Sequence, residues 1–107
     1  MKPFELYITY ISWERDGKYR PVVVLNTDEE VSLYPITTRY EQKSETIKKQ
    51  YYKIEEWSKA GLSRQSYIDT GTLLYLAKST IEDKKYIGNL SSKDKVRLLE
   101  FLQNRKS

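Results

Sequence analysis

The chain has 107 residues, of which 38% are hydrophobic and 32% are charged, and its formal net charge at pH 7 is +4. This length fits one domain with a small core, to which a second copy or a partner protein would add buried surface. The sequence contains neither cysteine nor histidine. Disulfides, thiolate metal sites and mechanisms that need an imidazole or a thiol nucleophile are therefore excluded. Any catalysis must use arginine, lysine, carboxylates, tyrosine or hydroxyl groups.

The charge and the tyrosine content weakly favour a polyanionic or acidic partner. The positive charge is scattered along the chain, which also fits an ordinary solvated surface. The ten tyrosines suit base stacking in single-stranded nucleic acid and half-buried strands equally well. Residues 1–9 lack the apolar core of a signal peptide, and no apolar run approaches the ~20 residues of a membrane span. We therefore expect a cytoplasmic protein without a membrane partner.

The first part of the chain predicts two strands joined by a charged loop. Residues 4–11 are β-branched and aromatic in rough alternation, which predicts a strand, and residues 13–18 form the loop. Residues 20–25 continue as an apolar run that is typical of a strand covered on both faces. Because Pro21 lacks a backbone N–H and restricts the residue before it, we place it at the start of this strand, with Arg20 at the strand entrance.

The next segment predicts a turn, a strand and a long loop. Residues 26–28 (Asn-Thr-Asp) have the composition of a turn, and residues 31–36 that of a strand in which Pro35 requires an edge, a bulge or an ending. The first three strands would then form a meander. Residues 38–49 lack a convincing apolar face and predict a mobile loop with room for a short helix.

The second half of the chain predicts short strands and a closing helix. The expected elements are a strand at residues 51–54, a helical turn at 55–59 that contains Trp57 and ends at Gly61, one or two strands within 66–69 and 71–77, and a turn at Gly88 and Asn89. Ser91 and Asp94 approximate a capping box. Val96, Leu99 and Leu102 recur at helical spacing, joined by Leu98 and Phe101, so we expect this stripe to pack in the core or in a dimer. Together the elements predict one mainly β domain over residues 1–107, either a strongly curved sheet or a small barrel, with a C-terminal helix.

Two segments place polar groups at the ends of apolar strands: residues 19–24 (Tyr-Arg-Pro-Val-Val-Val) and 34–39 (Tyr-Pro-Ile-Thr-Thr-Arg). They resemble the MazF/PemK toxins, which share an Arg-Pro before an apolar strand and, one strand later, Pro-x-Thr-Thr or Ile-Thr. Residues 61–68 are similar to the family's Gly-Leu and Ser-containing entry into a late strand, and residues 87–91 to its Ile-Gly-x-Leu turn. The four motifs occur in the family's order and cover nearly the whole chain.

The resemblance implies an SH3-like small barrel of five to seven strands, as in the CcdB, MazF and PemK toxins, and a homodimer. It implies the toxin of a type II toxin-antitoxin system: an endoribonuclease that cuts single-stranded mRNA at short sequences without a metal or other cofactor. It also implies an antitoxin partner, whose inhibitory segment we expect to be acidic and to cover the cleft at Arg20. The fold-level analogy alone does not establish the activity.

The family's catalytic arginine and threonine match Arg20 and Thr37, with Thr38 as a neighbour. A planar guanidinium can grip the phosphate oxygens on which negative charge accumulates when a 2′-hydroxyl attacks phosphorus, and Thr37 would donate a hydrogen bond to the same phosphate. Arginine is a poor proton shuttle, so we consider Glu14 and Asp16 as bases, although the family often has Glu-Gln-x-Gly in a slightly different register of this loop. The expected RNA contacts are Trp13, Arg15, Lys18, Tyr19 and Arg39.

Other interpretations remain open from the sequence. Arg20 could form a salt bridge with a loop carboxylate, Thr37 and Thr38 could simply end a strand, and Trp13 and Trp57 fit packing better than base stacking. A non-catalytic toxin of the same fold could bind a protein such as gyrase, but residues 103–107 lack the Trp-Gly-Ile type of ending that marks those toxins. A catalytically inactive regulatory partner is the third interpretation.

Overall fold

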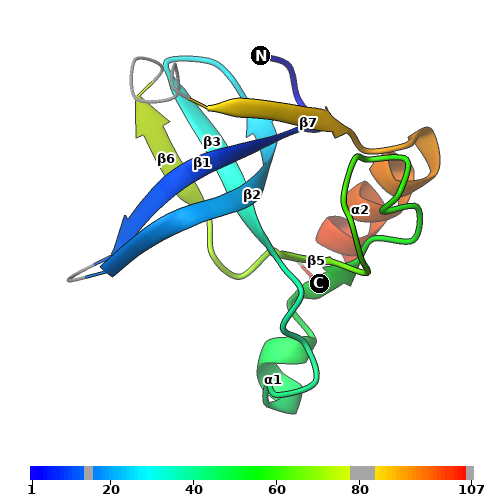
Figure 1. Cartoon of the computed structure of the whole chain (residues 1–107). Coiled ribbons are helices and arrows are strands. Elements are labelled where there is room, and N and C mark those ends of the chain that lie inside the picture. The colour runs from blue at the N-terminus through cyan, green and yellow to red at the C-terminus, as the bar shows by residue number, and fades with distance from the viewer. Residues whose placement is uncertain (14–15, 78–83, 106–107) are drawn as a thin grey trace.

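The computed structural model describes residues 1–13, 16–77 and 84–105, without the side chains of Ser12, Trp13 and Asp16. Within these residues the chain forms a twisted antiparallel sheet with a C-terminal helix at one side (Figure 1). The elements are β1 (Glu5–Trp13), β2 (Asp16–Asn26), β3 (Glu30–Thr37), α1 (Glu45–Lys48), β4 (Tyr51–Lys53), β5 (Tyr67–Asp69), β6 (Leu74–Ala77), β7 (Lys85–Asn89) and α2 (Ser92–Arg105). The predicted mainly β class and closing helix are confirmed.

The seven strands lie in the order β4-β5-β3-β2-β1-β7, with β6 also paired to β3. Strand pairing in the described ranges leaves the sheet open and does not close it into a barrel. β3 is the branch point: one edge pairs with β2, and the other pairs first with β6, up to Leu33, and then with β5, from Ile36. Pro35 lies where this edge changes partner. A residue without a backbone N–H is tolerated there because no ladder on that edge continues through it.

The β1–β2 hairpin is longer than the sequence predicted. β1 extends to Trp13 and β2 begins at Asp16, so most of the loop expected at residues 13–18 belongs to strands. Pro21 therefore lies inside β2 and not at its start, which corrects the prediction. Pairing of β2 with β3 begins only at Val22, so Pro21 falls where β2 still has one open edge.

Buried side chains form one cluster on each face of the sheet. The larger cluster packs against α2 and includes Leu6, Val23, Ile36, Ile68, Leu90 and Leu98. The smaller includes Tyr7, Ile11, Val22, Val24, Val31 and Leu33. Neighbours such as Val22 and Val23 fall in different clusters because successive side chains of a strand point to opposite faces. The apolar run in β2 is thus buried on both faces, as predicted.

Helix α2 packs through a different stripe from the one expected. Leu98 is fully buried, whereas Val96 and Leu99 are 56% and 51% exposed. Of the two expected alternatives, packing in the core is therefore wrong for these two residues, and a contact in a dimer stays a prediction. Asp94 is buried one turn before Leu98, and Leu102 packs against the cluster one turn after it, so the helix is rotated to place this i, i+4, i+8 row inward. No helix in the described part of the chain is long and apolar enough to cross a membrane.

The buried carboxylate of Asp94 joins the start of α2 to the segment after β4. It accepts hydrogen bonds from the Tyr52 hydroxyl at 2.5 Å and from the backbone N–H groups of Glu55 and Glu56 at 3.0 and 2.9 Å. The Asp94 N–H donates to Ser91 Oγ at 3.2 Å, so the serine half of the predicted capping box forms. Burial, and then the bond to Asp94, raise the pKa of Tyr52.

Two glycines near α2 have different roles from each other. Gly88 and Asn89, expected to form a turn, belong to β7, where Gly88 pairs with Leu6. A Cβ at Gly88 would lie 2.5 Å from the carbonyl oxygen of Ala60, so this glycine permits close approach of another segment and does not reverse the chain. Gly61 has a φ of +89°, and it ends the turn as the predicted left-handed cap.

The segment after β3 contains the short helix for which the sequence left room. Ser44 caps α1, and Lys48 Nζ lies 5.0 Å from the centroid of the Tyr40 ring. Tyr40 stacks on Tyr67 of β5, with ring centroids 4.3 Å apart. These contacts pack residues 38–49 against β5, beside the end of β3.

Candidate functional site

Arg20 and Thr37 lie just beyond the end of the β2–β3 ladder. The strands pair antiparallel, and the last pair at this end is Val22 with Pro35. Arg20 precedes Val22 by two residues inside β2, and Thr37 follows Pro35 by two residues at the end of β3. The two segments that carry the sequence motifs are therefore brought to the same region of the sheet.

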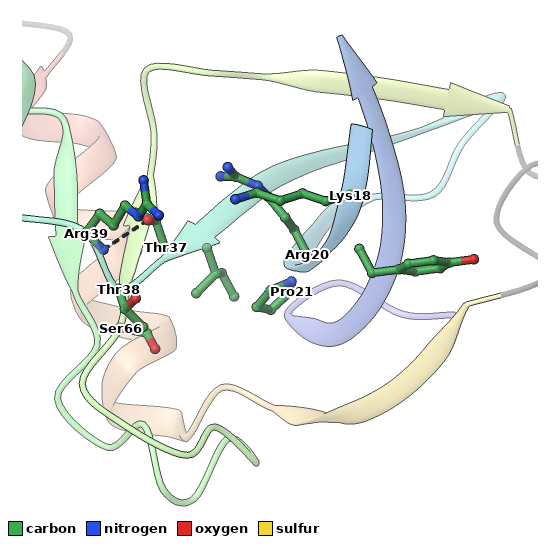
Figure 2. A pocket seen from close by; sticks show the side chains of 9 residues that line it. Lys18, Arg20, Pro21, Thr37, Thr38, Arg39 and Ser66 are labelled. Carbon is green, nitrogen blue, oxygen red and sulfur yellow. Dashed lines mark hydrogen bonds between the residues drawn. The ribbon is translucent and has the colours of Figure 1, made fainter. Parts of the chain in front are cut away.

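A solvent-open pocket lies at this end of the sheet (Figure 2). The volume of the pocket is about 200 Å³. Its lining consists of Lys18, Tyr19, Arg20, Pro21, Ile36, Thr37, Thr38, Arg39 and Ser66. In Figure 2 the charged ends of Lys18 and Arg20 extend from β2 toward Arg39 and Thr37. The pocket thus joins the motif residues of two strands to a residue from just before β5.

The lining of the pocket favours an anion. Lys18, Arg20 and Arg39 are cations, and no aspartate or glutamate of the described ranges lines the pocket. Arg20 is partly buried, and its Nε atom is shielded from solvent. Charge interactions are stronger where water is excluded, so a partly buried guanidinium beside two further cations would bind a phosphate or carboxylate group.

The Thr37 hydroxyl is oriented by the backbone that follows it. Its Oγ1 accepts the Arg39 N–H at 3.1 Å, drawn as the dashed line in Figure 2. A hydroxyl has one proton to donate as well as lone pairs to accept, so this contact leaves the O–H of Thr37 able to donate to a ligand. The same turn places the Arg39 side chain beside Thr37.

The positive charge of Arg20 also acts on Tyr51, a residue of strand β4. Burial and the carboxylate of Asp69 raise the pKa of Tyr51, while the positive charge of Arg20 partly offsets this rise. Tyr51 and Asp69 are cross-strand partners in β4 and β5. Asp69 is already held by the Gly71 N–H at 3.0 Å and the Thr72 hydroxyl at 2.8 Å. The Asp69 carboxylate therefore belongs to a turn beside the pocket and not to its lining.

Six of the residues singled out from the sequence come together in the pocket: Lys18, Tyr19, Arg20, Thr37, Thr38 and Arg39. Glu14 and Arg15 lie outside the described residues, and only the backbones of Trp13 and Asp16 are described. Asp16 precedes Arg20 by four residues in β2, which separates their Cα atoms by about 13 Å at roughly 3.3 Å per residue. Trp57 packs against the larger core cluster, in agreement with the packing interpretation.

Sequence reasoning missed Ser66 as part of this site. Ser66 is 2% exposed, and its Oγ donates to the Arg64 carbonyl at 3.0 Å, so it forms a wall of the pocket with its proton already used. It reaches the pocket because β5 pairs with the last two residues of β3. A single sequence carries no direct signal for a pairing across such a separation.

The described residues contain no group of three or more carboxylates that could hold a metal ion. In comparisons with known proteins, no protein-family model matches the sequence, and no curated protein matches it significantly. The geometry of the pocket is thus the basis on which a function can be argued.

Proposed function

We propose that this protein is a toxin of the MazF/PemK type that cleaves single-stranded mRNA without a metal ion. One observation carries the proposal: Arg20 and Thr37, which match the family's catalytic pair, line one cationic pocket. The antiparallel sheet with a closing helix supports it less specifically. An SH3-like barrel and a homodimer are parts of the same proposal.

The pocket suits a phosphodiester better than a small free anion. It is open to solvent, so a polymer can pass through it, and its cations come from β2 and from the segment that follows β3. The guanidinium of Arg20 can donate two parallel hydrogen bonds to phosphate oxygens, and Thr37 can donate a third. These groups would stabilise the charge that grows on the phosphate in the transition state.

The proposed reaction is a transesterification. The 2′-oxygen of the RNA attacks the adjacent phosphorus and loses its proton to a base, the bond from phosphorus to the 5′-oxygen breaks, and that oxygen takes up a proton. The products are a 2′,3′-cyclic phosphate and a 5′-hydroxyl end. Arg20 and Thr37 act on the phosphate oxygens and transfer no proton in this scheme.

We assign the proton acceptor to Glu14 or Asp16, the carboxylates that precede Arg20 in the sequence. Since no described carboxylate lines the pocket, the acceptor must approach the phosphate from outside that lining. Glu14→Gln and Asp16→Asn variants would identify it through loss of the low-pH limb of the pH–rate profile, where protonation of the base lowers the rate.

The proposed antitoxin inhibits by occupying the same pocket. An acidic segment would pair with Lys18, Arg20 and Arg39, the three cations of the lining, and would exclude RNA by competition. This arrangement predicts that RNA and the antitoxin segment cannot bind together.

The test is cleavage of a long single-stranded transcript by the purified chain in the presence of EDTA, with sequencing of the new ends. We expect cyclic phosphate and 5′-hydroxyl ends, and no cut at a position where the 2′-hydroxyl is replaced by hydrogen. Cleavage that persists at such a position would overturn the transesterification. An intact transcript at high ratios of protein to RNA would overturn the nuclease assignment.

A further inference from the structure

The β1–β2 hairpin projects beyond β3 (Figure 1), and residues 18–21 of its second strand line the pocket. Residues 17–20 of β2 pair with β1, while the pairing of β2 with β3 begins at Val22. Along this stretch no strand of the described residues pairs with the second edge of β2. A polymer bound in the pocket could cross that edge from one face of the hairpin to the other.

Two tyrosines lie on the hairpin face opposite Arg20. Tyr10 and Tyr19 are cross-strand partners, so they share a face, and Tyr19 is adjacent in sequence to Arg20, so its side chain points the other way. Their rings are 5.3 Å apart between centroids and meet edge to face at 69°. Tyr19 is 70% exposed and Tyr10 51% exposed, which leaves aromatic surface open to a ligand.

The position of the Tyr10 ring depends on Gly17. A Cβ at Gly17 would collide with the hydroxyl end of that ring. The ring thus lies along the strand over Gly17 and in edge contact with Tyr19. Tyr19 also lines the anion pocket, so the aromatic pair and the phosphate-binding groups are continuous.

We propose that Tyr10 and Tyr19 form a stacking site for an RNA base next to the phosphate held by Arg20 and Thr37. This proposal rests on the proposed function, because it takes single-stranded RNA as the ligand. Every base has an aromatic face, so stacking would add affinity with little dependence on sequence. The cations hold the backbone on one face of the hairpin, and the tyrosines hold a base on the other.

The test measures binding of short single-stranded RNAs of random sequence, 2′-O-methylated so that they cannot be cut, with one 2-aminopurine as a fluorescent base. Stacking on an aromatic ring quenches this base. Tyr19→Leu and Tyr10→Leu should each weaken binding by about 5- to 100-fold and remove the quenching at saturation. Tyr19→Phe and Tyr10→Phe should retain both, since the phenyl ring can still stack.

Two controls separate stacking from other effects. Tyr75 of β6 is 60% exposed, lies away from the pocket lining, and its change to leucine should alter neither binding nor quenching. Arg20→Ala should lower the salt dependence of binding, because a phosphate contact is lost, whereas Tyr19→Leu should leave that slope unchanged. Melting curves of each variant check that the fold is intact.

The outcomes distinguish this proposal from the proposed function. If RNA binding depends on Arg20 but the leucine variants bind and quench like wild type, the stacking site is overturned and the nuclease is untouched. If the tyrosines are needed for binding but no RNA is ever cut, the stacking site stands and the nuclease assignment falls. If the wild-type chain does not bind RNA, both are overturned.

Discussion

Asp94 and Arg20 are charged residues that the fold shields from solvent, but their surroundings differ. Four donors from the protein reach the carboxylate of Asp94, which is fully buried. At the pocket, Arg20 is joined by Lys18 and Arg39, with no described carboxylate in the lining. A buried charge surrounded by its own donors stabilises the fold, whereas like charges around an open pocket favour a ligand of opposite sign.

The largest effect expected on stability is that of removing the Asp94 carboxylate. Asp94→Ala leaves the Tyr52 hydroxyl and two backbone N–H groups without their acceptor, and each unsatisfied buried donor costs roughly 1–3 kcal/mol. We expect a loss of about 4 kcal/mol in the free energy of unfolding, measured by urea denaturation. RNA cleavage per folded molecule should be unchanged. A loss of activity without a loss of stability would contradict the structural role.

Thr37→Val reverses this pattern. The change removes a hydroxyl that can donate to the phosphate, and loss of one such donor typically raises the barrier by roughly 3 kcal/mol, or about a hundredfold in kcat. Melting temperature should change little, because Thr37 is partly exposed. Thr37→Ser keeps the hydroxyl and should retain most activity. Equal activity of the valine and serine variants at position 37 would show that the hydroxyl has no catalytic role.

Tyr52→Phe probes one donor of the Asp94 network. The ring remains in the core, but the carboxylate loses a hydrogen bond of 2.5 Å. Hydrogen bonds to charged groups contribute roughly 1.5–3 kcal/mol, so we expect a loss of about 2 kcal/mol in unfolding free energy. In the Asp94→Ala background the same change should cost much less. Additive losses would argue against direct coupling between the two residues.

Alkaline pH should give the smallest and most gradual effect. Burial and the hydrogen bond to Glu5 raise the pKa of Tyr7 to about 12, and the pKa of Tyr52 is raised as well, against an unfolded value of about 10. The unfolded chain therefore loses these protons first as the pH rises. Stability from the protonated hydroxyls is complete below pH ~10 and declines above it. Melting temperatures should fall above pH ~10, and less steeply in Tyr52→Phe.

The sequence predicted the local features of this fold better than its long-range contacts. The strands at β1 and β3, the left-handed cap at Gly61 and the closing helix follow from patterns within a few residues. The turn expected at Gly88 and the core packing expected as one alternative for Val96 are absent for tertiary reasons. Gly88 is required by the approach of Ala60, and the rotation of α2 is set by the donors that reach Asp94 from the segment after β4.

The candidate site likewise has residues that the sequence predicted from local patterns and one that depends on long-range strand pairing. Arg20 and Thr37 could be singled out because each borders an apolar stretch of sequence, and both line one pocket next to the end of the β2–β3 ladder. Ser66 could not, because it arrives through the pairing of β5 with β3. The open edge of β2 beside Tyr19 depends equally on where strand pairing stops, which a single sequence does not encode locally.

The most direct test of the account is cleavage of a single-stranded transcript by Arg20→Ala, Arg20→Lys and wild type, in EDTA and with the ends mapped. Arg97→Ala on α2, an exposed arginine paired with Glu55, is the matched control. We predict that Arg20→Ala melts like wild type and loses at least about a thousandfold in cleavage rate, with partial activity in Arg20→Lys, which keeps the charge without the bidentate grip. Undiminished cleavage at the same positions by folded Arg20→Ala would contradict the central claim that this pocket is the active site.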